Sequence, residues 1–269
     1  MKKKKNIWIR PALLFSLSAV LLLLSTVGST RAALTYYSAD YAVQVEIKSI
    51  GVSLLENNRV VSYRNYAETG SNEFVEGGTG LLKNESGESD RFGAGEGQEK
   101  LIPGKMYDEK LSVQNTGAID EYVRVVVTRS WQDADGKKAT DLDPGLIGLS
   151  LDGQDLDEFT EKNGWIKDTK AAGSDHERII LYYSRPVASQ AQTPAICDTL
   201  CLNGTLLDEY ETKPTEKPGV VTTTYKYNGY KFVLEAEVDA VQTHNAEDAI
   251  KSAWGVDVNI APDGTLSLK

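Results

Sequence analysis

Apolar and polar residues alternate along much of this chain, and a period of two is the pattern of a β-strand that buries one face. The longest example runs from Tyr230 to Ala240, where every second residue is apolar and most of the others are charged. Asn228-Gly229 precedes it, and a second strand-like stretch, 222–227, lies before that pair. Because a type I′ turn needs two residues with positive φ, Asn-Gly predicts a hairpin between these segments.

The segment 121–131 is apolar on both phases of the alternation. Its two faces would carry Val123, Val125 and Val127 on one side and Tyr122 and Val126 on the other. A strand of this kind lies inside a sheet that is covered on both faces. Further strand-like segments, bounded by Gly, Asn-Gly or Pro, lie at 35–47, 107–115, 145–153, 177–187 and 195–204, and Asp135-Gly136 marks another turn.

About eight such strands and a single late helix predict an all-β fold, a jelly-roll-like antiparallel β-sandwich. We expect one domain over 33–269. Residues 56–100 are polar and rich in Gly, so we interpret them as a long, mobile surface loop. The polar, Pro-containing segment 211–219 is interpreted as a connector.

One helix is predicted over 245–255. Asn245 is a suitable N-cap, acidic residues occupy the first turn, and Gly255 fits the position after the last turn. The apolar stripe of this helix comprises Ala246, Ala249, Ile250, Ala253 and Trp254. A helix this short is stable only when docked, so we expect the stripe to pack on the sandwich with Trp254 buried.

The first 32 residues differ from the rest. Lysines are followed by a short apolar run and then by small residues, which is the layout of a secretory signal peptide over 1–32. Cleavage is expected between Ala32 and Ala33. The alternative is a retained membrane anchor, although the apolar run is short for a span of about 20 residues.

The chain carries a net charge of −10, and removing the basic N-terminal segment would make the remainder more negative. Such a surface repels nucleic acid and anionic membranes, so neither is an expected partner; the membrane is involved only through the signal segment before cleavage. The two cysteines, Cys197 and Cys201, would share a strand face too far apart for a disulfide. We interpret both as buried thiols.

The sequence offers little chemistry. The stretch at 176–180 begins like a zinc-protease motif, but Ile180 stands where the second histidine is needed. His176 and His244 are therefore interpreted as a turn residue and a structural residue. The stretch 133–138 suggests a calcium loop, but Pro144 stands where the bidentate Glu belongs, so a turn is favoured. We expect no catalytic residue, no metal and no cofactor, and hence no enzyme.

The residues around the predicted cleavage site, a small-residue run followed by Ala33 and Tyr36-Tyr37-Ser38, resemble the exported proteins processed by the SipW-type signal peptidase, the TasA and camelysin family. The segments 111–127 and 235–256 are similar to that family as well. The resemblance implies a jelly-roll-like fold, secretion from a Gram-positive-type bacterium, and a place in the biofilm matrix or on the cell surface.

The resemblance also implies assembly of identical chains into fibres, in which the N-terminal segment of one subunit adds as a strand to the next. The proposed donor strand would use Leu34, Tyr36, Tyr37 and Tyr41, and its partners would be other copies and, during export, the signal peptidase. The alternatives are an ordinary edge strand of its own domain, a monomeric surface-displayed binding or adhesion module, and a camelysin-like metalloprotease, which the residues above do not support.

Overall fold

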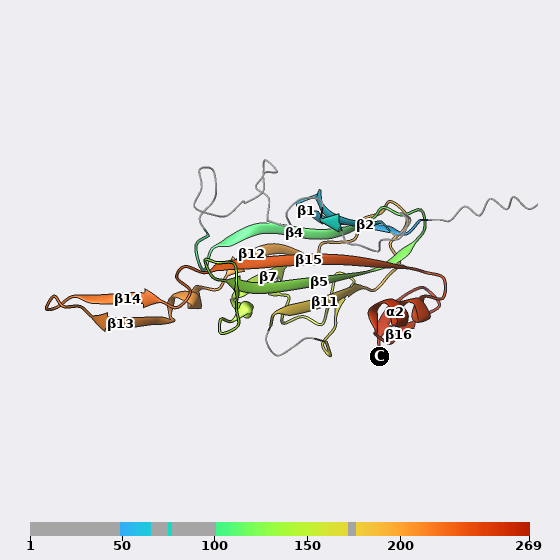
Figure 1. The fold of residues 1–269 in the computed structure, drawn as a ribbon. Coiled ribbons are helices and arrows are strands. Elements are labelled where there is room, and N and C mark those ends of the chain that lie inside the picture. The colour runs from blue at the N-terminus through green and yellow to red at the C-terminus, as the bar shows by residue number, and fades with distance from the viewer. Residues whose placement is uncertain (1–48, 66–74, 77–100, 172–175) are drawn as a thin grey trace, which may run out of the picture. The chain divides into compact units, whose positions relative to one another are not determined.

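The computed structural model describes residues 49–65, 75–76, 101–171 and 176–269 (Figure 1). About half of the described residues lie in antiparallel β-strands, which confirms the all-β prediction. The first sheet contains, in spatial order, β3 (Val75–Glu76), β2 (Arg59–Asn65), β1 (Gly51–Glu56), β4 (Met106–Asn115), β12 (Cys197–Leu202), β7 (Ile147–Leu151) and β8 (Gln154–Asp155).

The second sheet contains, in spatial order, β15 (Lys231–Gln242), β5 (Glu121–Gln132), β11 (Arg178–Tyr183), β10 (Trp165–Lys167) and β9 (Glu161–Lys162), with β6 (Lys138–Ala139) also paired to β5. Two small two-stranded sheets are formed by β13 (Tyr210–Pro214) with β14 (Val221–Tyr225) and by β16 (Val258–Ile260) with β17 (Leu266–Leu268). The helical elements are η1 (Pro144–Leu146), η2 (Gly204–Leu207) and α2 (Ala246–Trp254).

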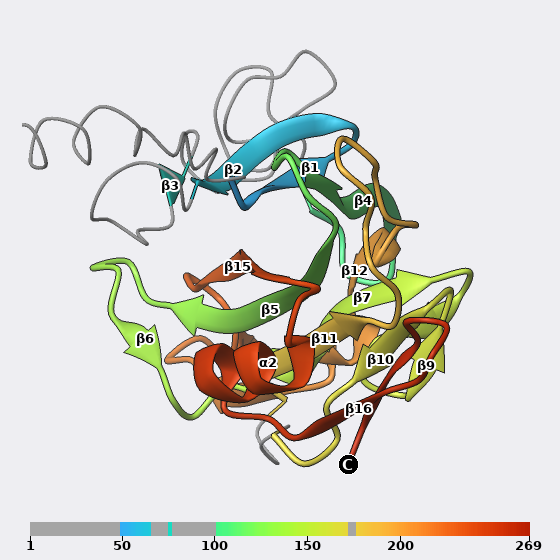
Figure 2. The same ribbon diagram turned by 90° about the vertical axis from the view of Figure 1, so that its right-hand side faces the viewer.

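Strand β5 divides the apolar interior into two clusters. Its odd-numbered valines face the first sheet, where they pack in one core with β1, β4, β7 and β12. Tyr122 and Val126 point the other way and meet Ile250 of α2 and Leu266 of β17. Figure 2 shows α2 against this outer face of the second sheet, with β1 and β4 on the opposite side. The prediction of a central strand covered on both faces is confirmed.

The interpretation of 56–100 as a loop is wrong for its first part. Asn57 and Asn58 both have positive φ, 48° and 64°, and they join β1 directly to β2. This is the two-residue connection that a type I′ hairpin requires, supplied by Asn-Asn rather than by Asn-Gly. Val61 of β2 is buried in the main core. Residues 66–74 and 77–100 lie outside the described residues.

The hairpin predicted at Asn228-Gly229 is also wrong. Only Gly229 has positive φ, and the turn leads from one sheet to another. β14 pairs with β13, while β15 pairs with β5 along all of its twelve residues. The long ladder buries Val238 and Ala240 in the core, which a hairpin with β14 would not do. The segment 211–219, interpreted as a connector, therefore contains most of β13 and the turn of the real hairpin.

The cysteines do not share a strand face. The pairing of β12 with β4 shifts register between Cys197 and Thr199, and this bulge rotates the residues after it. Cys197 is fully buried and its thiol donates to the Glu109 carbonyl oxygen at 3.3 Å, whereas Cys201 is only half-buried. Burial raises the pKa of the Cys197 thiol. Both cysteines are free thiols.

The predicted helix is present, with three corrections. Asn245 has left-handed φ and ψ of 50° and 42° rather than the extended backbone of an N-cap, so its side chain caps nothing. Ala253 is exposed, and Trp254 is half-buried instead of buried. Ala246 and Ile250 are buried, Ala249 packs beside them, and Gly255 ends the helix with φ 73°.

Trp254 nevertheless ties α2 to the sheet. Its ring lies 5.6 Å from that of Tyr182 and 5.4 Å from the Arg124 guanidinium carbon. We expect Trp254→Ala to lower the free energy of unfolding by about 2 kcal/mol, less than the roughly 3–5 kcal/mol of a fully buried aromatic, because the side chain is partly exposed to water. Chemical denaturation measures this. Ala253→Ser, on the exposed side of the same turn, is the control, and equal effects of the two changes would contradict the docking.

Candidate functional site

The outer edge of the first half of β15, around Leu234, is the feature best suited to bind another chain segment. β15 ends the second sheet, and among the described residues its only strand partner is β5. Arg129 of β5 donates its N–H to the Glu177 carbonyl oxygen at 2.8 Å, away from β15. Since Arg129 stands opposite Leu234, the N–H and C=O groups of Leu234 point to the free edge. Every second residue of β15 has the same orientation, so the N–H and C=O groups of Phe232 and Ala236 also point away from β5.

The same residues expose part of the main core. Phe232, Leu234 and Ala236 face the core but are only partly buried, whereas Val238 and Ala240 further along the strand are fully buried. The first half of β15 thus offers main-chain donors and acceptors beside apolar side chains that are half in water. An added strand with small apolar or aromatic side chains would use both features.

The second half of β15 is held by what we call the charged clamp, formed by Arg64, Arg124, Glu237 and Asp239. Asp239 is 4% exposed. It accepts from Arg124 Nε of β5 at 3.0 Å and lies 2.7 Å from Arg64 Nη1 of β2. Arg64 also pairs with Glu237 at 2.5 Å. Because Arg64 belongs to the first sheet, the clamp joins the two sheets along this side.

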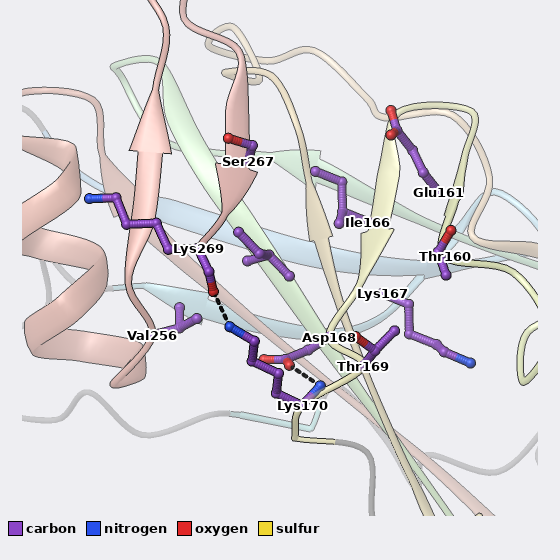
Figure 3. Close-up of a pocket in the computed structure, with 11 residues that line it drawn as sticks. Thr160, Glu161, Ile166, Lys167, Asp168, Thr169, Lys170, Val256, Ser267 and Lys269 are labelled. Atoms are coloured by element: carbon purple, nitrogen blue, oxygen red, sulfur yellow. Dashed lines mark hydrogen bonds between the residues drawn. The ribbon is translucent and has the colours of Figure 1, made fainter.

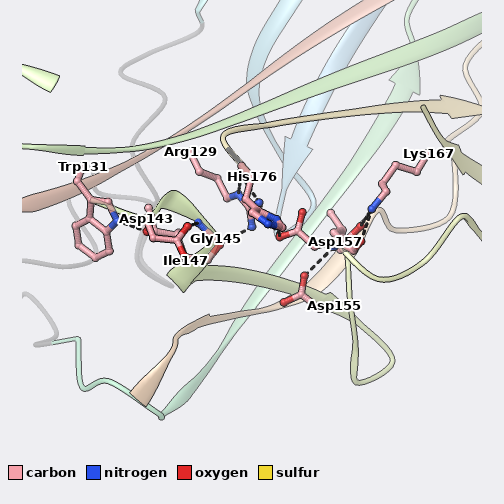
Figure 4. A network of polar contacts seen from close by, with 10 residues as sticks. Arg129, Trp131, Asp143, Gly145, Ile147, Asp155, Asp157, Lys167 and His176 are labelled. Atoms are coloured by element: carbon pink, nitrogen blue, oxygen red, sulfur yellow. Dashed lines mark hydrogen bonds and ion pairs between the residues drawn. The ribbon is translucent and has the colours of Figure 1, made fainter. Parts of the chain in front are cut away.

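Arg129 is a second polar centre, but its donors are consumed (Figure 4). The guanidinium is fully buried and donates to the carbonyl oxygens of Ile147, at 2.9 Å, and of His176. It also pairs with Asp157 at 2.8 Å. Asp157 further contacts His176 Nδ1 at 3.7 Å. The contacts of Arg129 therefore hold loops together.

The other sequence motifs lie in ordinary structural places. His176 has φ 55° in the turn before β11, and Ile180 is buried in β11 under the helix. Asp133 Oδ1 accepts from the Asp135 and Lys137 N–H groups, at 3.0 and 2.9 Å, within the turn that joins β5 to β6. His244 is exposed just before α2. In the described part of the chain, no group of three or more His, Cys, Asp or Glu residues is placed to hold a metal ion.

A surface hollow of about 340 Å³ lies between the 166–170 segment and β17 (Figure 3). Its polar groups bind each other. Asp168 accepts from the Lys170 and Ala171 N–H groups at 3.0 and 2.9 Å, and the Lys170 ammonium donates to the Lys269 carbonyl oxygen. The Lys167 ammonium donates to the Leu156 carbonyl oxygen at 3.1 Å. We assign this hollow no ligand.

Glu121 is a buried carboxyl group at the junction of the two sheets. Its Oε1 accepts from the Gly51 N–H at 2.9 Å, at the start of β1, and its Oε2 is buried without a hydrogen-bond partner. Burial raises the pKa of Glu121 to about 8, although the Gly51 bond opposes this. Near pH 7 the group is therefore mostly a neutral acid.

Comparison with known proteins adds no assignment: no family model and no curated protein matches the sequence, and no solved structure matches the fold. None of the helices within the described residues combines the length and the apolar character needed to cross a membrane.

Two of the predicted sites lie outside the described residues. These are the cleavage site at Ala32 and Ala33 and the donor strand with Leu34, Tyr36, Tyr37 and Tyr41. Sequence reasoning missed the charged clamp, Arg129 and Glu121. The available signal was a charged residue within an otherwise apolar strand: Arg124 and Arg129 interrupt the valine run of β5, and such a residue has to be paired when its strand is buried.

The charged clamp should be a measurable part of the stability. Asp239→Ala leaves two partly buried guanidinium groups without their shared carboxylate, so we expect the free energy of unfolding to fall by about 3 kcal/mol. Glu237→Ala removes a half-exposed partner of the same Arg64 and should cost less than about 1 kcal/mol. Denaturant titration of both variants checks this order; a larger loss from Glu237→Ala would refute the role given to Asp239.

The raised pKa of Glu121 predicts a pH dependence of stability. The folded state keeps a proton that the unfolded chain releases above the ordinary pKa of 4.5. The stability that this proton contributes is complete below about pH 4.5 and is lost as the pH rises to about 8. Glu121→Gln cannot titrate, so its stability relative to the wild type should increase across this window, by at most about 1.4 kcal/mol per pH unit. Unfolding midpoints at several pH values measure it, and Glu235→Gln, at an exposed site, is the control.

Proposed function

We propose that this chain is an exported structural protein of the extracellular matrix or cell surface that assembles into fibres by strand donation. After removal of residues 1–32 by a SipW-type signal peptidase, the segment that begins at Ala33 would add to the outer edge of the first half of β15 in the next copy. The observation that carries this proposal is this part of the edge, where Phe232, Leu234 and Ala236 combine outward main-chain groups with half-buried core side chains.

Two further features support the proposal. The resemblance of the cleavage region to the TasA and camelysin family suggests the mode of assembly. The β15 edge offers groups that an added strand could bind: main-chain hydrogen bonds would supply affinity, while Tyr37 and Tyr41 of the donor would pack beside Phe232 and Leu234. A contact in which one copy donates and the next accepts builds a filament when the rotation between successive copies does not close a ring.

A monomeric surface-displayed module is the second candidate. It is favoured by the same edge, since a strand from the same chain can occupy it. In that case the segment 33–41 is an ordinary strand of its own domain, and its removal exposes the core beside Leu234. The metalloprotease candidate receives no support from the described residues, where no group of three or more His, Cys, Asp or Glu residues is placed to hold a metal ion.

Electron microscopy of the chain beginning at Ala33 should show fibres. Deleting Ala33 to Asp40 should leave a folded monomer with a nearly unchanged melting temperature that forms none, because the deleted segment belongs to the neighbour's sheet. A truncated chain that still polymerises, or that unfolds, would place the segment inside its own subunit and contradict strand donation.

The acceptor edge has its own control within this experiment. Ala236→Pro removes one outward N–H without touching the ladder to β5, so it should also prevent fibres while the chain stays folded. Ala236→Gly keeps the N–H at the same position and should still allow them. Fibres formed equally by both variants would exclude the β15 edge as the acceptor.

A further inference from the structure

The β13–β14 hairpin is the most exposed β-structure among the described residues. All ten residues of its two strands are exposed, and Figure 1 shows the hairpin reaching away from the two larger sheets. Tyr210, Val221 and Tyr225 are between 44% and 58% exposed. A two-stranded hairpin is marginal in water unless something further covers it.

The register fixes which main-chain groups are free. Lys226 donates its N–H to the Glu209 carbonyl oxygen at 2.8 Å, and Thr215 donates to the Val220 carbonyl oxygen at 3.0 Å, so these pairs bond across the hairpin. Because bonded and non-bonded pairs alternate, Val221, Thr223 and Tyr225 direct their N–H and C=O groups to the outer edge of β14. On β13 the corresponding residues are Tyr210, Thr212 and Pro214.

The outer edges of β13 and β14 differ in how well their residues prevent pairing with another strand. β13 carries Glu211 and Lys213, and Pro214 has no N–H to offer. β14 has the sequence Val-Thr-Thr-Thr-Tyr, with no charge, no Pro and only β-branched and aromatic residues. Its pairing with β13 shows no register shift. The β14 edge thus lacks the devices that normally prevent edge-to-edge pairing.

The side chains match those of a second copy. Val221, Thr223 and Tyr225 lie on one face of the hairpin, opposite Pro214, Thr212 and Tyr210 of β13. If two β14 strands pair antiparallel about a two-fold axis through Thr223, Thr223 meets its own counterpart. Val221 then stands opposite Tyr225 of the second copy, twice. Aromatic with β-branched and Thr with Thr are both favourable cross-strand pairs.

Charge also favours a second copy at this place. The chain carries a net charge of −10, so two copies repel each other over most of their surface. The stretch from Val220 to Tyr225 is free of charge, and in the two-fold register Lys226 stands opposite Val220 of the other copy rather than opposite another lysine. The β14 edge is therefore a place where two acidic chains can approach without bringing like charges together.

We propose that β14 is a self-association edge, at which two copies of this chain pair their β14 strands into one four-stranded sheet. One such strand pair buries far less than the roughly 800 Å² per partner of a stable complex. The contact is accordingly weak between two isolated chains and becomes effective where many copies are held close together. The proposal does not rest on fibre formation through β15, which uses a different edge.

Cross-linking tests the register. In a hydrogen-bonded antiparallel pair the two Thr223 Cα atoms lie about 5.5 Å apart, within disulfide range. The chain beginning at Ala33 with Thr223→Cys should therefore form disulfide-linked dimers under mild oxidation. Thr222→Cys, on the opposite face of β14, and Thr212→Cys, on the β13 edge, should dimerise no more than the wild type. Dimers from either control to the same extent, or none from Thr223→Cys, would overturn the proposal.

Thr223 and Thr212 stand opposite each other in the hairpin and both point their N–H groups outward, which provides a second, matched test. In sedimentation experiments over a range of concentrations, Thr223→Pro should weaken self-association at least about tenfold, because two main-chain hydrogen bonds at the two-fold axis are lost. Thr212→Pro should leave it unchanged. Equal weakening by both, or by neither, contradicts the β14 edge.

The two assembly proposals can fail independently. Thr223→Pro should remove pairing through β14 but leave fibres that depend on the β15 edge, and Ala236→Pro should do the reverse. Fibres without cross-linked Thr223→Cys dimers refute the β14 edge alone, and dimers without fibres refute strand donation alone.

Discussion

Strand β5 is the constraint on which the rest of the structure depends. It is buried on both faces and paired on both edges, so each of its neighbours has a fixed place: β15 and β11 beside it, the first sheet over its valines, and α2 over Tyr122 and Val126. Two arginines in such a strand cannot remain unpaired. Arg124 is satisfied by the charged clamp and Arg129 by loop carbonyl oxygens and Asp157. The polar centres of the molecule therefore follow from the apolar strand that contains them.

The two proposed assembly edges also follow from the pairing of β5. β15 pairs along its full length with β5, and β14 pairs with β13. The first half of β15 therefore has an outer edge beside the core, and the short β14 edge lies away from it. The β15 edge combines main-chain groups with half-buried apolar side chains, whereas the β14 edge has only its main chain and three small or aromatic side chains per copy. We infer strand donation at the β15 edge and weak pairing of two β14 strands at the β14 edge.

Local pattern predicted the strands and their burial well, because the alternation of β7 shows which of its faces is buried, and the apolar residues on both phases of β5 and β11 show that both faces are covered. The helix was likewise predictable from its apolar stripe and Gly255. Which strands pair with each other could not be predicted from the local pattern. Asn228-Gly229 carries a strong hairpin signal, yet the twelve-residue ladder between β15 and β5 outweighs one turn, and a ladder between segments about a hundred residues apart leaves no mark in a local window. The charged clamp and the contact of Glu121 could not be predicted for the same reason, since each joins residues from different sheets. The predicted cleavage site and donor strand lie outside the described residues.

The contacts of Arg129 have a consequence for the chemical conditions in which the fold persists. The guanidinium reaches residues 18, 28 and 47 positions away along the chain and fastens them at one buried point, as a disulfide does in many small proteins. Unlike a disulfide, this cross-link involves no electron transfer, and a guanidinium keeps its charge at any pH that a protein survives. Both cysteines are free, and Cys197 is sealed in the core. Reduction therefore breaks no covalent cross-link in this fold, because the two cysteines of the chain are both free and the buried tie is a guanidinium.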